Sequence, residues 1–97
     1  MRDFIMLMHN DAVAETTSEM WSSYFSFLRG RRVFEGGSSI GLGQTFRKQA
    51  LPGTVSKHLS GYIRVQAESL TEASDLLTGN PVFECGGTVE IRELPRE

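Results

Sequence analysis

The chain has 97 residues, of which 39% are hydrophobic and 23% are charged, and its formal net charge is −2. This length fits a single domain over residues 1–97, the composition is that of a soluble globular protein, and a slightly acidic chain has no electrostatic reason to bind nucleic acid. No apolar run approaches the roughly 20 residues that span a bilayer, and the one cysteine excludes an internal disulfide, so we expect a cytoplasmic protein.

The first predicted element is a strand over residues 4–8 that is apolar on both faces. Phe4, Met6 and Met8 lie on one side, whereas Ile5 and Leu7 lie on the other. Such a strand needs cover on both faces, and one layer of helices covers only one of them. We therefore predict a homodimer in which a second copy covers the other face.

A polar loop at residues 9–11 leads to a predicted helix. Thr16 and Glu19 have the spacing of a capping box, and Gly30 can end the helix after about Arg29. An apolar stripe at helical spacing lies between these limits: Met20, Trp21, Tyr24, Phe27 and Leu28.

Residues 33–44 are predicted to form an irregular or bulged edge strand. Four glycines weaken this strand, although three of its residues need burial: Val33, Ile40 and Leu42. The glycines on either side of Leu42 lack the third glycine of a dinucleotide-binding loop. Pro52 and Gly53 mark a turn within residues 46–59, which we expect to be a hairpin extension or a flexible arm over a pocket.

The second half of the chain reads as strand, helix and strand. Residues 62–67 and 88–94 both alternate between apolar and polar side chains, as strands with two different faces do. Residues 69–72 have the form of a capping box. Gly79 suits the left-handed position after a helix, and Pro81 prevents the helix from continuing into the loop that follows.

These elements predict an α+β fold with the order β-α-β-β-α-β. This is the ferredoxin-like unit, a four-stranded antiparallel sheet with two helices on one face. Its central strands should be residues 4–8 and 62–67, which agrees with the apolar character of the first strand.

Several segments also resemble the YCII-related family, in its DGPF-domain branch. They are residues 4–8, Gly61-Tyr62-Ile63, Ser69-Leu70-Thr71-Glu72-Ala73 and Gly87-Thr88-Val89-Glu90-Ile91-Arg92. The resemblance implies the same fold, paired through its sheets as a dimeric α/β barrel. The Asp-Gly-Pro-Phe segment that names the branch is missing, and residues 51–54 are at best a shortened remnant of it.

The leading candidates for chemistry are His9 and Asp11, at the end of the first central strand. A histidine titrates near neutral pH, and a nearby carboxylate orients it and stabilises its charged form. The family resemblance implies that a His–Asp pair is used in those members thought to be enzymes. The alternative is a surface loop in which Asp11 caps a turn.

A second group of candidates lies in and before the third strand. Lys57 matches a lysine common before the Gly-Tyr of the DGPF branch, and His58 follows it. Together they would supply an anion anchor and a proton shuttle. The alternative is that both side chains are solvated residues at the start of a strand. Tyr62 and Arg64 face away from the helices. Arg64 would pair there with a carboxylate ligand or with a residue such as Glu90 of the other subunit.

Two functions remain open at this stage, beside a cofactorless monooxygenase that rests on fold analogy alone. The first is a cofactor-independent enzyme that carries out proton transfer, isomerisation or elimination on a small organic acid. In that enzyme His9 is the acid or base, Asp11 orients it, and Arg64 or Lys57 anchors the anion. The second is a non-catalytic ligand-binding or protein-interaction module linked to transcription regulation, since similar domains accompany sigma factors in some proteins. We expect no metal site, because two histidines and one cysteine are too few for structural zinc.

Overall fold

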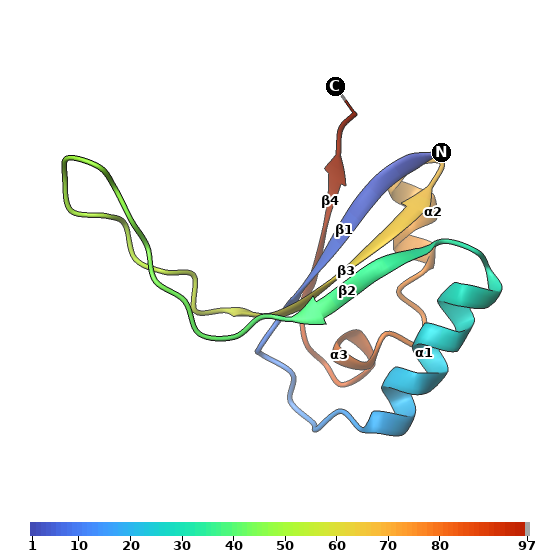
Figure 1. Ribbon diagram of the computed structural model, residues 1–97. Coiled ribbons are helices and arrows are strands. Elements are labelled where there is room, and N and C mark those ends of the chain that lie inside the picture. Colours follow the sequence, from blue (N-terminus) through green and yellow to red (C-terminus); the bar gives the residue numbers. More distant parts are fainter. Residues whose placement is uncertain (97) are drawn as a thin grey trace.

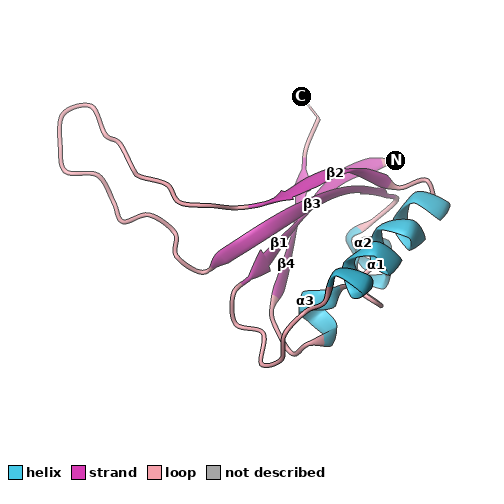
Figure 2. Ribbon diagram, turned by 60° about the horizontal axis from the view of Figure 1, so that its bottom comes forward, coloured by secondary structure: helices cyan, strands magenta, loops and turns pink. Residues whose placement is uncertain are grey.

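The computed structural model describes residues 1–96. Four antiparallel strands form one sheet, and three helices cover one of its faces (Figures 1 and 2). The order of the strands in the sheet is β2-β3-β1-β4, which makes β1 and β3 central. The elements are β1 (Arg2–His9), α1 (Ser18–Gly30), β2 (Phe34–Ser39), β3 (Leu59–Ala67), α2 (Leu70–Asp75), α3 (Pro81–Glu84) and β4 (Val89–Leu94). The predicted ferredoxin-like α+β fold is confirmed, with one additional helix.

Alternation along the central strands gives the sheet two different faces. Met6 lies opposite Ile63 and Leu7 lies opposite Tyr62, and paired residues of neighbouring strands point to the same side. The positions that face the helices are almost completely buried: Phe4, Met6, Met8, Ile63, Val65 and Ala67. We call the other side the open face; its residues are Asp3, Ile5, Leu7 and His9 of β1, Tyr62, Arg64 and Gln66 of β3, and Glu90, Arg92 and Leu94 of β4.

Helix α1 begins one residue later than the capping pattern predicts. Thr17 is the N-cap, and its side chain accepts a hydrogen bond from the backbone N–H of Met20 at 3.1 Å. The hydroxyl of Thr16 instead accepts a hydrogen bond from the indole N–H of Trp21 at 3.2 Å. This bond fixes the indole against the loop that leaves β1. The helix includes Gly30 as its last residue, one residue beyond the predicted end, and the left-handed residue that follows is Arg32 with φ of 58°.

Tyr24 of α1 holds this helix against the end of α2. Its side chain is 2% exposed, its hydroxyl donates to the carbonyl oxygen of Leu76 at 2.7 Å, and burial raises its pKa to about 12. Replacing Tyr24 with Phe leaves this carbonyl without its donor. We expect the free energy of unfolding in urea to fall by about 1–2 kcal/mol. An unchanged unfolding midpoint would contradict this role for the hydroxyl.

The segment after α2 differs from the prediction. Ser69 caps α2 and Gly79 has a left-handed backbone with φ of 90°, both as expected. Pro81, however, begins a further short helix, and the side chain of Asn80 caps it by accepting a hydrogen bond from the N–H of Phe83 at 3.1 Å. A proline is tolerated in the first turn because its missing N–H has no helical partner there. Helix α2 has already ended at Asp75, so Pro81 does not stop it and instead starts the next helix. The prediction of a loop over these residues was therefore wrong.

β2 is a bulged edge strand, as predicted, with a register shift between Phe34 and Gly37. It ends at Ser39, however, and Ile40 and Leu42, which were expected to be buried, lie beyond it and are exposed. A Cβ atom on Gly37 would lie 2.5 Å from the carbonyl oxygen of Tyr62, so only glycine fits here. Residues 40–58 form a long hairpin between β2 and β3, which we call the arm. The arm extends away from the body instead of folding over it, and it leaves on the side of the sheet opposite the helices (Figures 1 and 2).

Candidate functional site

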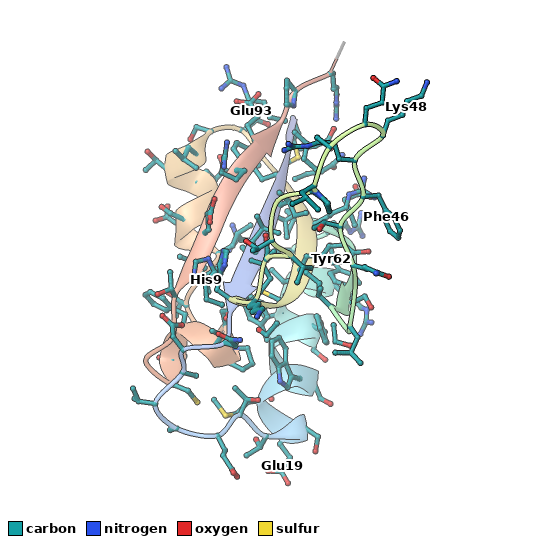
Figure 3. All side chains as sticks on the ribbon, turned by 90° about the vertical axis from the view of Figure 1, so that its left-hand side faces the viewer. His9, Glu19, Phe46, Lys48, Tyr62 and Glu93 are labelled. Carbon is teal, nitrogen blue, oxygen red and sulfur yellow. The ribbon has the colours of Figure 1, made fainter. Side chains whose placement is uncertain are left out.

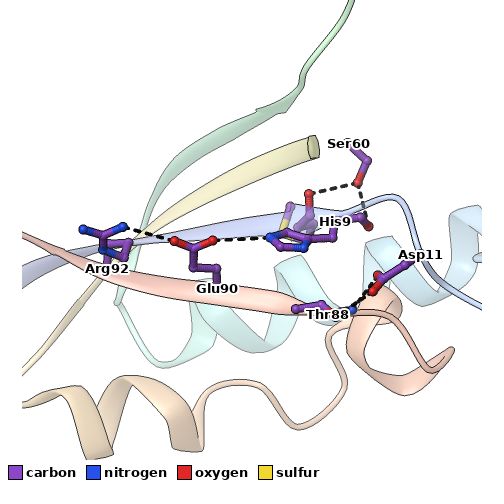
Figure 4. Close-up of polar contacts among 7 residues, drawn as sticks. His9, Asp11, Ser60, Thr88, Glu90 and Arg92 are labelled. Carbon is purple, nitrogen blue, oxygen red and sulfur yellow. Dashed lines mark hydrogen bonds and ion pairs between the residues drawn. The ribbon is translucent and has the colours of Figure 1, made fainter. Parts of the chain in front are cut away.

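One end of the open face carries a chain of polar contacts centred on His9 (Figure 4). His9 is the last residue of β1, and its Nε2 atom lies 3.4 Å from Oε1 of Glu90 on the adjacent strand β4. The second carboxylate oxygen of Glu90 accepts a hydrogen bond from Arg92 at 3.1 Å. The hydrogen bond from Arg92, and then that from His9, hold the pKa of Glu90 below its usual value. An ionised carboxylate therefore stands beside the imidazole at neutral pH.

The backbone next to His9 is held by Ser60 of β3. The register between β1 and β3 shifts between Met8 and His9. The hydroxyl of Ser60 is 3.3 Å from the carbonyl oxygens of both these residues, as a shared donor. This irregularity, together with the pairing of β1 and β4, fixes the position from which the imidazole projects.

Asp11, the predicted partner of His9, is bound to Thr88 instead. Its Oδ1 accepts the backbone N–H of Thr88 at 2.8 Å and its Oδ2 accepts the hydroxyl at 2.6 Å (Figure 4). These two bonds hold the pKa of Asp11 below its usual value. Asp11 thus ties the loop after β1 to the start of β4, a long-range contact that neither sequence-based alternative predicted, and Glu90 occupies the place expected for Asp11.

Replacing Asp11 with Asn should make the stability of the protein depend less on acid pH. The folded-state pKa of Asp11 lies below the ordinary 3.8. Its contribution is therefore present above about pH 4 and is lost as the pH falls through the lower folded value. We expect a melting temperature a few degrees lower at pH 7 and a smaller difference at pH 3, with Thr88→Val as the matched variant. Parallel shifts of wild type and variant at every pH would contradict this assignment.

His58, the residue before β3, lies next to His9 at the same end of the sheet. The two ring centroids are 4.8 Å apart and the rings meet edge to face. The loop after β1 holds this region in place, because Asn10 donates from its backbone to the carbonyl oxygen of His58 at 2.8 Å and from its side chain to that of Lys57 at 2.7 Å. The imidazoles of His9 and His58 and the carboxylate of Glu90 thus come together from three distant segments. The side chain of Lys57 is exposed, and only its backbone carbonyl takes part, as the acceptor for Asn10.

Tyr62 and Arg64 lie on the open face, as predicted. Tyr62 and Glu90 flank Leu7 in one row of the sheet, and Arg64 and Arg92 flank Ile5 in the next row. Within residues 1–96 Arg64 forms no ion pair, so its guanidinium is available to an anion on this face. Figure 3 looks onto this face and shows His9 and Tyr62 on it.

Sequence reasoning did not assign Glu90 and Arg92 to the site. The alternation of residues 88–94 already placed them on one side of a strand, and the ferredoxin-like order places that strand beside β1. The missing information was the register, which sets Glu90 opposite Leu7 and therefore within reach of His9.

Two of the hollows beside this cluster share Trp21 and Ser60. The first, of about 370 Å³, lies between α1 and the strands β2 and β3; apart from Ser60 it is lined by Met8, Trp21, Phe25, Gly37, Ser38, Ser39, Gly61, Tyr62 and Ile63. The second, of about 450 Å³, is lined by His9, Asn10, Ala12, Ala14, Glu15, Thr16 and Val82 in addition to the two shared residues. An apolar hollow and one that includes His9 therefore adjoin each other.

Comparison with known proteins finds no family model that matches the sequence and no curated protein that matches it. Among residues 1–96, no three His, Cys, Asp or Glu side chains lie close enough together to hold a metal ion. Over the same described residues, none of the helices has both the length and the apolar character needed to cross a membrane.

Proposed function

We propose that the protein is a cytoplasmic homodimer of the YCII-related type, in which two open faces pack together as an α/β barrel. Ile5 and Leu7, in the middle of a central strand, remain partly exposed within one subunit. A second sheet would remove this apolar surface from water, at about 25 cal/mol per Å². The same face also carries charges of both signs, so two copies related by a twofold axis can match cation to anion: Asp3, Arg64, Glu90 and Arg92.

We further propose that this barrel binds a small organic acid and transfers a proton on it without a cofactor. The contact of 3.4 Å between His9 and Glu90 carries this proposal. A carboxylate that stays ionised stabilises the imidazolium that forms when His9 accepts a proton. Arg64, whose guanidinium has no ion-pair partner within residues 1–96, is suited to bind the carboxylate of the substrate.

His58 and Lys57 take supporting roles in this proposal. The ring of His58 is near enough to exchange a proton with His9 directly or through one water molecule. Lys57, next to it at the base of the arm, is a second anchor for an anion. A proton removed next to the carboxylate and returned elsewhere gives isomerisation, and loss of a neighbouring group gives elimination.

Solvent exchange tests the activity without knowledge of the product. The wild-type protein is incubated in D₂O with a panel of small aromatic and lactone-like organic acids, and the loss of acidic C–H protons is followed by NMR. We expect at least one acid to exchange faster with protein than in buffer of the same pH. If several acids bind and none exchanges, proton transfer is excluded for that panel and the second candidate gains support.

The second candidate function is a non-catalytic ligand-binding or protein-interaction module with the same fold. Its proposed role is in transcription regulation. This function is favoured by the apolar hollow beneath α1, whose described lining residues include no histidine, carboxylate, lysine or arginine. A ligand there would raise the melting temperature and leave the NMR signals of His9 unchanged.

A further inference from the structure

We infer that the arm of each subunit wraps around a second copy of this chain and places Phe46 in that copy's apolar hollow beside Trp21. This inference rests on the dimer of the proposed function, because it requires the second copy to lie on the open face. It adds a second contact region, remote from the paired sheets.

The arm carries large apolar side chains that its own subunit does not cover. Leu42, Phe46 and Leu51 are 108%, 84% and 89% exposed. The hydroxyl of Thr45 donates to the carbonyl oxygen of Gly53, which ties the two legs of the arm together in an extended hairpin. Three large apolar side chains left exposed on one short segment favour an interaction surface, which is the first support for a contact between the arm and another molecule.

The direction of the arm selects a second copy as that surface. Figure 3 looks onto the open face, and the arm, with Phe46 and Lys48 on it, stands on the viewer's side of the sheet. Figures 1 and 2 agree that the arm and the helices lie on opposite sides of the sheet. Any subunit that covers the open face is therefore flanked by the arm.

Phe46 is far enough along the arm to reach beyond the partner's sheet. It is the seventh residue of the arm, so at about 3.3 Å per residue it lies about 23 Å along its leg. Two facing sheets pack about 10 Å apart, and the hollow lies just beyond the partner's sheet, between that sheet and α1. The arm can thus pass the edge of the partner's sheet and reach the hollow between its α1 and β2.

The charge of the arm favours its contact with the body of the partner subunit and disfavours its contact with the partner's arm. Residues 40–58 contain three basic residues and no acid, whereas the rest of the chain contains seven basic and twelve acidic residues. Two arms therefore repel each other, and each is attracted to the acidic body of the other subunit. At the hollow, Glu15 lines the neighbouring surface with Trp21, and Glu19 lies in the first turn of α1.

The tip of the arm matches this site in both shape and charge. Phe46 is followed by Arg47 and Lys48, so one aromatic ring and two cations meet an aromatic-walled hollow that has Glu15 beside it. The rings of Trp21 and Phe25 stack with their centroids 5.8 Å apart and form that wall.

Trp21 is the only tryptophan of the chain and can report directly on this contact. In a Cys85→Ala background, one subunit carries Trp21→Phe and a quencher on a cysteine at Gln49→Cys; the other subunit keeps Trp21 and carries no label. Any quenching in mixed dimers then crosses the subunit boundary. We expect clear quenching, which Arg47→Glu with Lys48→Glu on the labelled arm reduces, and which Glu15→Lys with Glu19→Lys on the other subunit restores.

A parallel measurement of molecular mass separates the possible failures. A dimeric mass without quenching overturns the arm contact and leaves the sheet dimer standing. A monomeric mass overturns both. Quenching that is unaffected by the charge reversals overturns the assignment of Glu15 and Glu19. In addition, Phe46→Ala should weaken the dimer about tenfold or more by removing a buried aromatic side chain, while Gln44→Ala on the same arm should not; equal effects contradict the placement of Phe46.

Discussion

Leu7→Glu is expected to convert the dimer into a monomer. Leu7 lies in the middle of the open face between Tyr62 and Glu90, where it is half-buried in one subunit. In the proposed dimer the new carboxylate would be buried next to Glu90 with no cation in its row. An uncompensated buried charge costs about 3–5 kcal/mol, which corresponds to a dissociation constant at least about 100-fold higher.

Light scattering over a range of concentrations measures this change directly. Because the open face is accessible to solvent in the single subunit, the variant should keep its fold, and circular dichroism checks that it does. Ser22→Glu is the matched control, since it adds the same charge at an exposed position on α1 and should leave the mass unchanged. A wild-type protein that remains monomeric at high concentration would remove the barrel from the proposal.

His9→Gln is expected to abolish the proton transfer proposed for this site. A positioned acid or base contributes about 10²–10⁴-fold to the rate, and glutamine has no group that titrates in its place. Glu90→Gln should retain the fold and lower the rate by about 10–100-fold, because the amide does not stabilise the imidazolium. The exchange assay in D₂O measures both effects.

The pH profile and one further variant distinguish the roles of the two carboxylates. The lowered pKa of Glu90 keeps this group ionised down to below its ordinary 4.5, so a fall in rate between pH 5 and 7 would not come from Glu90. Asp11→Asn should leave the rate almost unchanged, because Asp11 is bound to Thr88. A loss of rate in Asp11→Asn as large as that in Glu90→Gln would return Asp11 to the role first expected for it.

The starts of α1 and α3 differ from the sequence-based prediction, and both differences have a local physical cause. Thr16 and Thr17 are chemically equivalent candidates for the N-cap of α1, and the choice between them depends on the indole of Trp21, which binds the hydroxyl of Thr16. Pro81 is compatible with the end of one helix and with the first turn of another. The side chain of Asn80, which is fully buried and caps α3, decides in favour of the second.

The periodicity of the sequence by itself determined the elements other than α3, their order and the two faces of the central strands. The reason is that burial on one side of a strand selects side chains two residues apart, a signal that is entirely local. The apolar residues at positions 5 and 7 likewise mark an open face in need of cover. These features suffice for the ferredoxin-like fold, and they also place Tyr62 and Arg64 correctly.

Only the tertiary structure decided which carboxylate meets His9. Asp11 is close to His9 along the chain, but the turn after β1 carries its side chain to Thr88. Glu90 is distant in sequence, yet the pairing of β4 with β1 brings its oxygen within 3.4 Å of the imidazole. Strand order and register depend on the packing of the whole sheet, and a shift of one residue would turn Glu90 to the opposite face.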